Sequence, residues 1–374
     1  MKKMKKIMFL TLVFVLVMQV LSGCGGSGSS SSSSSTGSAP AAGSGSSSAA
    51  SGDSIGIDGE YVIRIGMTTS GAHVINYTAE QYKERVEAET GGKIKVEIYP
   101  ASQLGTTAQM LESALDGSLQ CIMMPHAYFV NIAPGIAIIE MPFIFDAKQG
   151  VGEQCFRILN AGTSLDDYIA KKGLTPALWL RSGQNYIIGN MPFSSMADLK
   201  GRKIRCHTSE FQQAEIASYG AAPTQVDTGD LAPSLQNKTI DGVLADISFT
   251  TSQKTYEISP YFSLVPGGAI TLAMMFSTAW FETLPQNVQE YLLKVAKEIG
   301  EGPSYDYYIK VETEGQNELR DNGAEVIIPS DAFLADLKSA SASVHDLYKN
   351  KDSECAQIYD EFVALIKADS EAHK

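Results

Sequence analysis

The fold is decided by the stretch KIKVEIYPASQLGTTAQMLESALDGSLQCIMM at residues 93–124. Its first seven residues alternate between charged and apolar side chains until Tyr99, which is the period of a half-buried strand. Apolar residues then recur at helical spacing over residues 107–116, and Gly117 follows as the expected C-cap. Residues 119–124 are almost entirely apolar, which is typical of a buried strand. The stretch therefore predicts strand, helix and strand joined by short loops.

The same alternation continues on both sides of this stretch. Upstream, residues 61–67 are predicted to form a strand and residues 78–89 a helix, which Gly91 and Gly92 end. Strands and helices joined by short loops form mostly parallel sheets that are covered by helices. Two such halves, followed by a helical C-terminal third that Gly302-Pro303 kinks, predict an α/β protein of two lobes with a cleft. Further strands are expected at 174–181, 186–189, 202–206, 224–226, 240–244 and 270–277, and further helices at 209–219 and 230–237.

Residues 1–23 are predicted to be a secretory signal peptide. Four lysines precede an apolar run of 15 residues, Ile7–Leu21, which is short for a membrane-spanning helix. The run ends in Leu21-Ser22-Gly23-Cys24, which resembles a bacterial lipobox. Cys24 is therefore expected to carry lipid, and two acyl chains hold a protein stably on a membrane. The alternative is an uncleaved anchor with a chance cysteine.

Residues 24–59 are predicted to be a flexible linker that follows the lipidated cysteine. Residues 25–54 contain 15 serines and 7 glycines, with an unbroken serine run at 29–35. Such a composition buries too little surface to offset the entropy of an ordered chain. The linker serves either as a tether that lets a domain sample space above the membrane or as a spacer through cell wall.

The overall composition fits a large folded protein with an acidic surface. Hydrophobic residues make up 44% of the 374 residues and charged residues 19%, which excludes wholesale disorder and suggests about two domains. Removal of residues 1–23, which hold four lysines and no acid, changes the formal charge from −13 to −17. This balance argues against binding to nucleic acid or to an anionic membrane by electrostatics.

No pattern in the chain points to catalysis or to a bound metal. The sequence contains no G-x-S-x-G elbow, phosphate-binding loop or H-E-x-x-H motif, and its histidines do not pair at metal-ligand spacing. We expect no enzyme activity, no metal and no cofactor. We also expect no structural disulfide, although an exported protein can oxidise its thiols. The cysteines concerned are Cys121, Cys155, Cys206 and Cys355.

Polar residues at the ends of predicted strands are the candidates for a binding site. Arg205 ends an apolar strand, and its planar guanidinium group suits two parallel hydrogen bonds to a carboxylate. A salt bridge to an acid of the protein itself is the alternative. Three histidines near strand ends, His73, His126 and His207, are each either ligand contacts or structural residues.

Several motifs in register resemble the solute-binding proteins of TRAP transporters, the DctP-like family. The turn YPASQLG at 99–105 and the strand lead-in DLKGRKIR at 198–205 carry the resemblance most clearly. Further matches are LDGSL at 115–119, MPFIF at 141–145 and LQNKTIDG at 235–242. Order and spacing agree over more than 300 residues, from residue 61 to the C-terminal helices.

The resemblance implies a two-lobed fold of the periplasmic-binding-protein type, class II, with a ligand cleft between the lobes and a long C-terminal helical region. It implies interleaved lobes, with residues 60–182 and 271–310 in lobe I and residues 183–270 and 311–374 in lobe II. It also implies delivery of a solute to a membrane permease that uses an ion gradient.

The resemblance assigns Arg205 the role of gripping a substrate carboxylate. A second arginine that is common in the family is replaced, because Gly183-Gln184-Asn185 stands at its position. The asparagine of a family DGQEN run is also lost, and Asp246 lies one residue further on. Asp246 is either a contact for an ammonium or hydroxyl group or a helix N-cap. The other candidate ligand contacts are Asn185, Gln184, Thr68, Thr69, His73, Met123, His126, Tyr128, Thr208 and Phe249.

These features together predict a monomeric extracytoplasmic lipoprotein, anchored to the outer face of the cell membrane, that binds a small organic carboxylate for a TRAP permease. One alternative is a ligand sensor of the same fold that feeds a signalling receptor, and another is an ABC-type binding protein. An exported hydrolase is a third class, against which the lack of a nucleophile and base pattern counts.

Overall fold

The computed structural model describes residues 55–374. The predicted signal peptide, the lipidated Cys24 and residues 25–54 of the predicted linker lie outside the described residues. No helix within residues 55–374 is long and apolar enough to cross a membrane. The four cysteines in this part of the chain are buried free thiols.

The first sheet has five strands in the order β2-β1-β3-β10-β4. Strand β1 runs parallel to β2 and β3, whereas β10 runs antiparallel to β3 and β4. The strands are β1 (Tyr61–Met67), β2 (Ile94–Tyr99), β3 (Cys121–Pro125), β4 (Leu174–Leu180) and β10 (Leu272–Ser277).

The second sheet has six strands in the order β11-β9-β5-β8-β6-β7. Strand β6 is parallel to β7 and β8, and β5 is antiparallel to β8 and β9. The strands are β5 (Tyr186–Gly189), β6 (Lys203–Cys206), β7 (Ala222–Gln225), β8 (Gly242–Ala245), β9 (Tyr261–Ser263) and β11 (Glu325–Ile327).

The parallel pairing predicted for the strands of residues 61–124 is confirmed, whereas β10 and β5 run antiparallel to their neighbours, so each sheet mixes parallel and antiparallel pairs. The chain leaves the first sheet after β4, builds most of the second, and returns as β10 between β3 and β4. A strand that returns in this way has no helical crossover to make it parallel to its neighbours. The fold class itself, α/β with two sheets, is confirmed.

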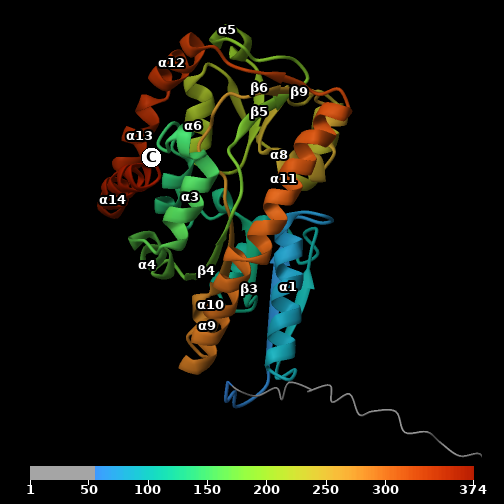
Figure 1. Ribbon diagram of the computed structural model, residues 1–374, viewed down its shortest axis with the longest axis vertical. Helices are drawn as coiled ribbons and strands as arrows, with labels where there is room; N and C mark the ends of the chain where they lie inside the picture. The colour runs from blue at the N-terminus through green and yellow to red at the C-terminus, as the bar shows by residue number, and fades with distance from the viewer. Residues whose placement is uncertain (1–54) are drawn as a thin grey trace, which may run out of the picture. The chain divides into compact units, whose positions relative to one another are not determined.

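Helices surround both sheets (Figure 1). The labelled strands of the first sheet lie in the lower half of the view, those of the second sheet in the upper half, and α11 runs alongside both. The helices are α1 (Val74–Glu89), α2 (Thr107–Leu115), α3 (Val151–Asn160), α4 (Ser164–Ala170), α5 (Met196–Leu199), α6 (Glu210–Ser218), α7 (Leu231–Gln236), α8 (Ile247–Ser252), α9 (Thr278–Phe281), α10 (Gln286–Glu301), α11 (Pro303–Asp321), α12 (Asp331–Ala340), α13 (Ala342–Lys349) and α14 (Ser353–Ala372). Short 3₁₀ helices are η1 (His126–Tyr128), η2 (Pro134–Glu140), η3 (Ala147–Gln149), η4 (Thr228–Asp230) and η5 (Thr255–Glu257).

Helix α1 begins four residues before the predicted start. The His73 Nδ1 atom accepts a hydrogen bond from the Ile75 backbone N–H and caps the helix. Thr78, where the helix was expected to start, lies inside the helix, and its hydroxyl donates to the Val74 carbonyl at 2.8 Å. Histidine is not among the residues that usually mark a helix start, so the sequence carried no signal for this boundary.

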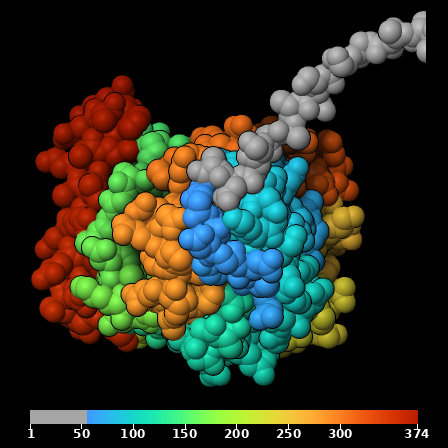
Figure 2. Space-filling view, turned by 90° about the horizontal axis from the view of Figure 1, so that it is seen from below, coloured from blue at the N-terminus to red at the C-terminus, as the bar shows by residue number. Residues whose placement is uncertain are grey.

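The C-terminal helix α14 packs against η2, α3 and α4. Figure 2 shows the C-terminal helices along one side of the molecule, beside the segment of α3 and α4. Phe362 and Ile366 join a hydrophobic core with residues of η2 and α4, and Arg157 of α3 makes a two-pronged ion pair with Asp369. The chain passes from the first sheet to the second between residues 180 and 186, returns to the first between 263 and 272, and enters the second again between 277 and 325. The lobe boundaries given above remain a proposal.

Candidate functional site

Arg205 lies in β6 and is one of the largest fully buried side chains, with 1% of its surface exposed. Its Nε donates to the Val226 carbonyl at 2.8 Å, and its Nη2 lies 3.4 Å from the Tyr128 hydroxyl. Its Nη1 lies 3.5 Å from the His207 Nε2 atom. Within residues 55–374, no carboxylate lies at ion-pair distance from this guanidinium group. The alternative of a salt bridge to an acid of the described chain is therefore excluded.

An inner cavity of about 20 Å³ adjoins Arg205. It forms where polar residues follow strands of both sheets, since Thr69 and His73 come after β1 and Asp246 comes after β8. Ligand sites of α/β proteins form at the carboxyl ends of strands. The lining residues are Thr69, His73, Pro125, Arg205, His207, Thr228, Leu244, Ala245, Asp246, Phe249, Ile270 and Leu272.

Two helix N-caps face this cavity. His73 caps α1, and the Asp246 carboxylate caps α8 by accepting from the Phe249 backbone N–H at 2.7 Å. Asp246 is therefore a helix N-cap, and because it also lines the cavity, its contact with an ammonium or hydroxyl group of a ligand stays a prediction. Burial lowers the pKa of His73 to about 4, although the charge of Asp246 opposes this shift. His73 is accordingly a neutral side chain near pH 7.

A buried chain of polar contacts leads from Arg205 to Glu140 at the end of η2. His207 Nδ1 lies 3.2 Å from Gln212 Oε1, and the Gln212 amide nitrogen donates to Glu140 Oε1 at 3.0 Å. The Ser209 hydroxyl bonds the second oxygen of Glu140. Burial and the neighbouring Arg205 hold the pKa of His207 well below its usual range. The ring is therefore neutral, and its Nε2 can accept from the guanidinium group while its Nδ1–H donates to Gln212.

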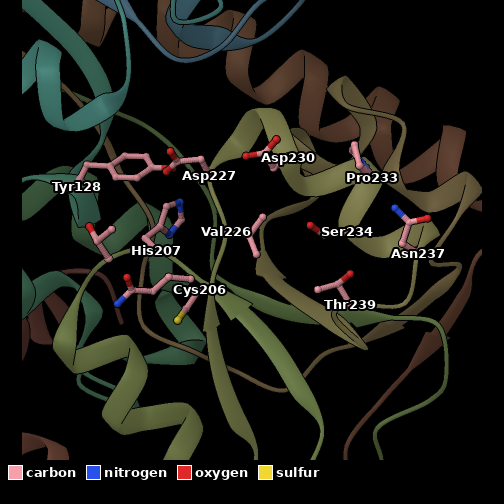
Figure 3. Close-up of a pocket in the computed structure, with 12 residues that line it drawn as sticks. Tyr128, Cys206, His207, Val226, Asp227, Asp230, Pro233, Ser234, Asn237 and Thr239 are labelled. Carbon is pink, nitrogen blue, oxygen red and sulfur yellow. The ribbon is translucent and has the colours of Figure 1, made fainter.

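A larger and more open pocket of about 570 Å³ lies outside the inner cavity (Figure 3). Its walls include Tyr128, His207 and Asp227, and Figure 3 shows the Tyr128 ring pointing toward Asp227. His207 lines both spaces and so forms part of the wall between them. The Tyr128 hydroxyl also lies 3.3 Å from the Thr228 hydroxyl, which joins the segments that follow the two sheets.

The structure brings together Arg205, Thr69, His73, Asp246 and Phe249 of the predicted site. Tyr128 and Thr208 line the outer pocket, and Thr68 lines a separate pocket of about 230 Å³. The remaining predicted residues lie elsewhere, and ligand contact by them stays a prediction: Gln184 lines an apolar groove beside Gly267, Asn185 packs against Gly267, Met123 lies in the core of the first sheet, and His126 contacts Thr271.

Several lining residues were not predicted as ligand contacts. Leu244, Ala245 and Leu272 are apolar strand residues and Ile270 is an apolar residue just before β10, and nothing in the sequence separates them from ordinary core residues. His207 stood among the strand-end histidines but was left open between two roles. The contact between the Tyr128 and Thr228 hydroxyl groups joins residues 100 positions apart, and a local sequence pattern does not reveal such a contact.

The chemistry of this arrangement is that of binding. Within residues 55–374 no group of three or more histidine, cysteine or acidic side chains could hold a metal ion. Arg205 offers a cation, Thr69 and Thr228 offer hydroxyl groups, and Phe249 with the strand residues offers apolar walls. A small number of polar groups in a mostly apolar enclosure is the usual composition of a small-molecule site.

Comparison with known proteins identifies the family to which the chain belongs. Residues 65–352 match the DctP family, the bacterial extracellular solute-binding proteins of family 7. The C4-dicarboxylate-binding periplasmic protein DctP of Vibrio cholerae is 26% identical over 242 residues, which cover 64% of this chain and 72% of the relative. The ectoine-binding periplasmic protein TeaA of Halomonas elongata is 23% identical over 326 residues, covering 82% of this chain and 94% of the relative.

A solved structure has the same fold. The TRAP periplasmic solute-binding protein of Desulfovibrio salexigens with bound orotic acid superposes with a TM-score of 0.75 at 23% identity, covering 82% of this chain and 100% of that one. The family match favours transport over the sensor and ABC-type alternatives. This chain belongs to the bacterial extracellular solute-binding protein family 7, the solute-binding proteins of TRAP transporters.

Proposed function

We propose that this protein captures a small organic carboxylate in the inner cavity and that Arg205 holds the carboxylate. The observation that carries the proposal is a fully buried guanidinium group that lines the cavity and has no carboxylate partner within residues 55–374. An unpaired buried charge is costly, so buried charges in proteins are usually paired. A ligand carboxylate would supply the missing partner, and the planar guanidinium group could bind both of its oxygens.

The captured solute would be delivered to a membrane permease of the TRAP type. The family match and the TRAP-transporter relatives support this partner, and the relatives named above bind a dicarboxylate, ectoine or orotic acid. The acidic composition supports a protein that approaches the membrane through a specific partner rather than by general electrostatic attraction.

We also propose that the protein is a monomer held at the outer face of the membrane by lipid on Cys24. The lipobox sequence and the serine-rich linker support this anchor. Metabolic labelling with an alkyne fatty acid should label the wild-type protein and leave the Cys24→Ala variant unlabelled. Equal labelling of the two proteins would exclude the anchor.

The carboxylate site is tested by substitution of Arg205. Removal of one partner of a buried hydrogen-bonded charge pair costs roughly 2–5 kcal/mol, which weakens binding about 30-fold to several thousand-fold. Calorimetry with succinate, orotate and other organic acids should therefore show near loss of binding by Arg205→Gln. Arg205→Lys should bind with intermediate affinity because it keeps the charge but not the planar fork.

Lys203→Gln is a matched control, since Lys203 is an exposed residue of the same strand. It should leave affinity unchanged. If Arg205→Gln lowers the melting temperature of the ligand-free protein but leaves affinity for the acids intact, Arg205 is a structural residue and the proposal fails.

A further inference from the structure

The inner cavity is lined by two buried charges of opposite sign. Arg205 and Asp246 are 1% and 2% exposed, and both line the cavity of about 20 Å³. They belong to neighbouring parallel strands, since Arg205 pairs with Val243 in the register of β6 and β8, and Asp246 follows β8. The two groups are not within ion-pair distance of one another. Each therefore faces the cavity without the other as its counter-ion.

Asp246 accepts hydrogen bonds only from neutral groups. The Ser182 hydroxyl donates at 2.7 Å, the Ser248 hydroxyl at 3.1 Å and the Phe249 backbone N–H at 2.7 Å. No basic side chain within residues 55–374 lies at ion-pair distance from this carboxylate. A carboxylate can accept about four hydrogen bonds, so capacity remains for one more donor.

The neighbouring basic groups do not supply the missing cation. Arg181 directs its Nε to Glu153 at 2.9 Å, and its Nη2 lies 4.0 Å from Glu312. His73 and His207, the two histidines of the cavity wall, are kept neutral by burial, which lowers the pKa of His73 to about 4 and holds the pKa of His207 well below its usual range. The remaining wall is made of hydroxyl groups and apolar side chains.

Building on the proposed function, we propose that the ligand is a small zwitterion, whose carboxylate binds Arg205 and whose ammonium or amidinium group lies against Asp246. Such a ligand pairs both buried charges at once. A dicarboxylate would pair Arg205 but bring its second negative charge toward Asp246, and among the described residues no second unpaired cation lines the cavity to receive it. Like charges placed together in a site disfavour the wrong ligand strongly.

The proposal is tested with three probes that share a four-carbon chain. Succinate carries two negative charges, 4-aminobutyrate carries one of each sign, and 4-hydroxybutyrate replaces the ammonium by a neutral hydroxyl. Ectoine, a cyclic amidinium carboxylate, serves as a second zwitterion of different shape. Calorimetry should show that the better of the two zwitterions binds at least about tenfold more tightly than succinate and 4-hydroxybutyrate.

Asp246→Asn removes the charge and keeps a residue that caps helices well. It should weaken binding of the zwitterion at least about tenfold and bring its affinity close to that of the neutral hydroxy acid. Asp246→Glu, which keeps the charge, should keep the preference for the zwitterion. Asp336→Asn is the matched control, because Asp336 is an exposed acid of α12 that lines neither the inner cavity nor the outer pocket, and it should change nothing.

The outcomes separate this inference from the proposed function. Preference of the wild-type protein for succinate, or an unchanged preference in a folded Asp246→Asn variant, overturns the zwitterion and leaves carboxylate capture intact. If Asp246→Asn does not fold, the preference of the wild-type protein decides alone. Failure of the folded wild-type protein to bind any of the four probes at millimolar concentration counts against carboxylate capture and therefore against both.

Discussion

Glu140 is a buried acid at the meeting of segments from the two sheets. It ends η2 and accepts hydrogen bonds from Ser209 and Gln212, which belong to the start of α6. Burial raises the pKa of Glu140 to about 8, although these hydrogen bonds oppose the shift. The groups around it are Glu215, whose pKa burial also raises to about 8, and His126, whose Nε2 lies 3.5 Å away and whose pKa burial lowers to about 4. This cluster therefore responds to pH in the physiological range.

Glu140→Gln should flatten the dependence of stability on pH. An unfolded glutamate has a pKa near 4.3, so between about pH 4.3 and pH 8 the folded protein binds more protons than the unfolded chain. The free energy of unfolding then falls as pH rises through this window, by at most about 1.4 kcal/mol per pH unit from one group, and levels off above it. Urea unfolding at pH 6.5, 7.5 and 8.5 should show a smaller decline for the variant.

Glu112→Gln, at an exposed residue of α2, is the control and should follow the wild-type protein. The measurement starts at pH 6.5 because the buried neutral His126 adds stability as pH rises toward that value. Parallel curves for wild type and Glu140→Gln would show that the buried acid does not titrate as described.

At the scale of elements, strands with a strong local pattern were predicted well. The predicted bounds of β1 and β5 agree with the structure, and those of β2 differ by one residue. Strands β9 and β11 have three residues each, and the parallel pairing that joins them brings together Tyr261 and Glu325, which lie far apart in sequence. Pairing between distant segments also explains why the sequence singled out Arg205 but not Ile270 and Leu272. The place of Ile270 and Leu272 in the cavity depends on the return of β10 to the first sheet.

The docking of α14 offers a test at this scale. Phe362 is completely buried against η2, whereas its neighbour Val363 is 45% exposed. Truncation of a buried phenylalanine to alanine usually costs about 3–5 kcal/mol, because it removes apolar contacts and leaves a cavity. Phe362→Ala should therefore lower the free energy of unfolding by about this amount in a denaturant titration.

Val363→Ala is the matched control and should change the stability by about 0.5 kcal/mol or less, since surface substitutions away from special features usually have small effects. Equal effects of the two substitutions would mean that α14 is not docked against η2 in solution.

At the scale of the whole molecule, the two sheets enclose a site that is nearly filled. The inner cavity of about 20 Å³ exceeds only slightly the roughly 10–15 Å³ that one water molecule needs. A four-carbon acid occupies several times the space of one water molecule. Contacts that cross between the segments, such as Tyr128 with Arg205 and with Thr228, must therefore separate to admit a ligand.

Binding should hold the molecule in a compact arrangement, relative to the open arrangement that admits the ligand. A ligand that contacts residues on both sides of the cavity favours the closed arrangement over an open one. Small-angle X-ray scattering should give a smaller radius of gyration with a saturating acid that calorimetry has shown to bind than without it. Arg205→Gln at the same acid concentration should keep the larger value. An equal radius for wild type with and without bound acid would show that the cavity adapts without separation of the two sides.

The small volume of the inner cavity has a consequence for kinetics. A bound solute that is sealed behind His207 and Tyr128 has no way out until the contacts across the cavity break. Its dissociation rate constant then cannot exceed the rate at which the ligand-bound protein opens. Tighter ligands lengthen the residence time by making opening rarer. A permease that separates the two sides of the cavity would itself set the rate of release, for tightly and weakly bound ligands alike.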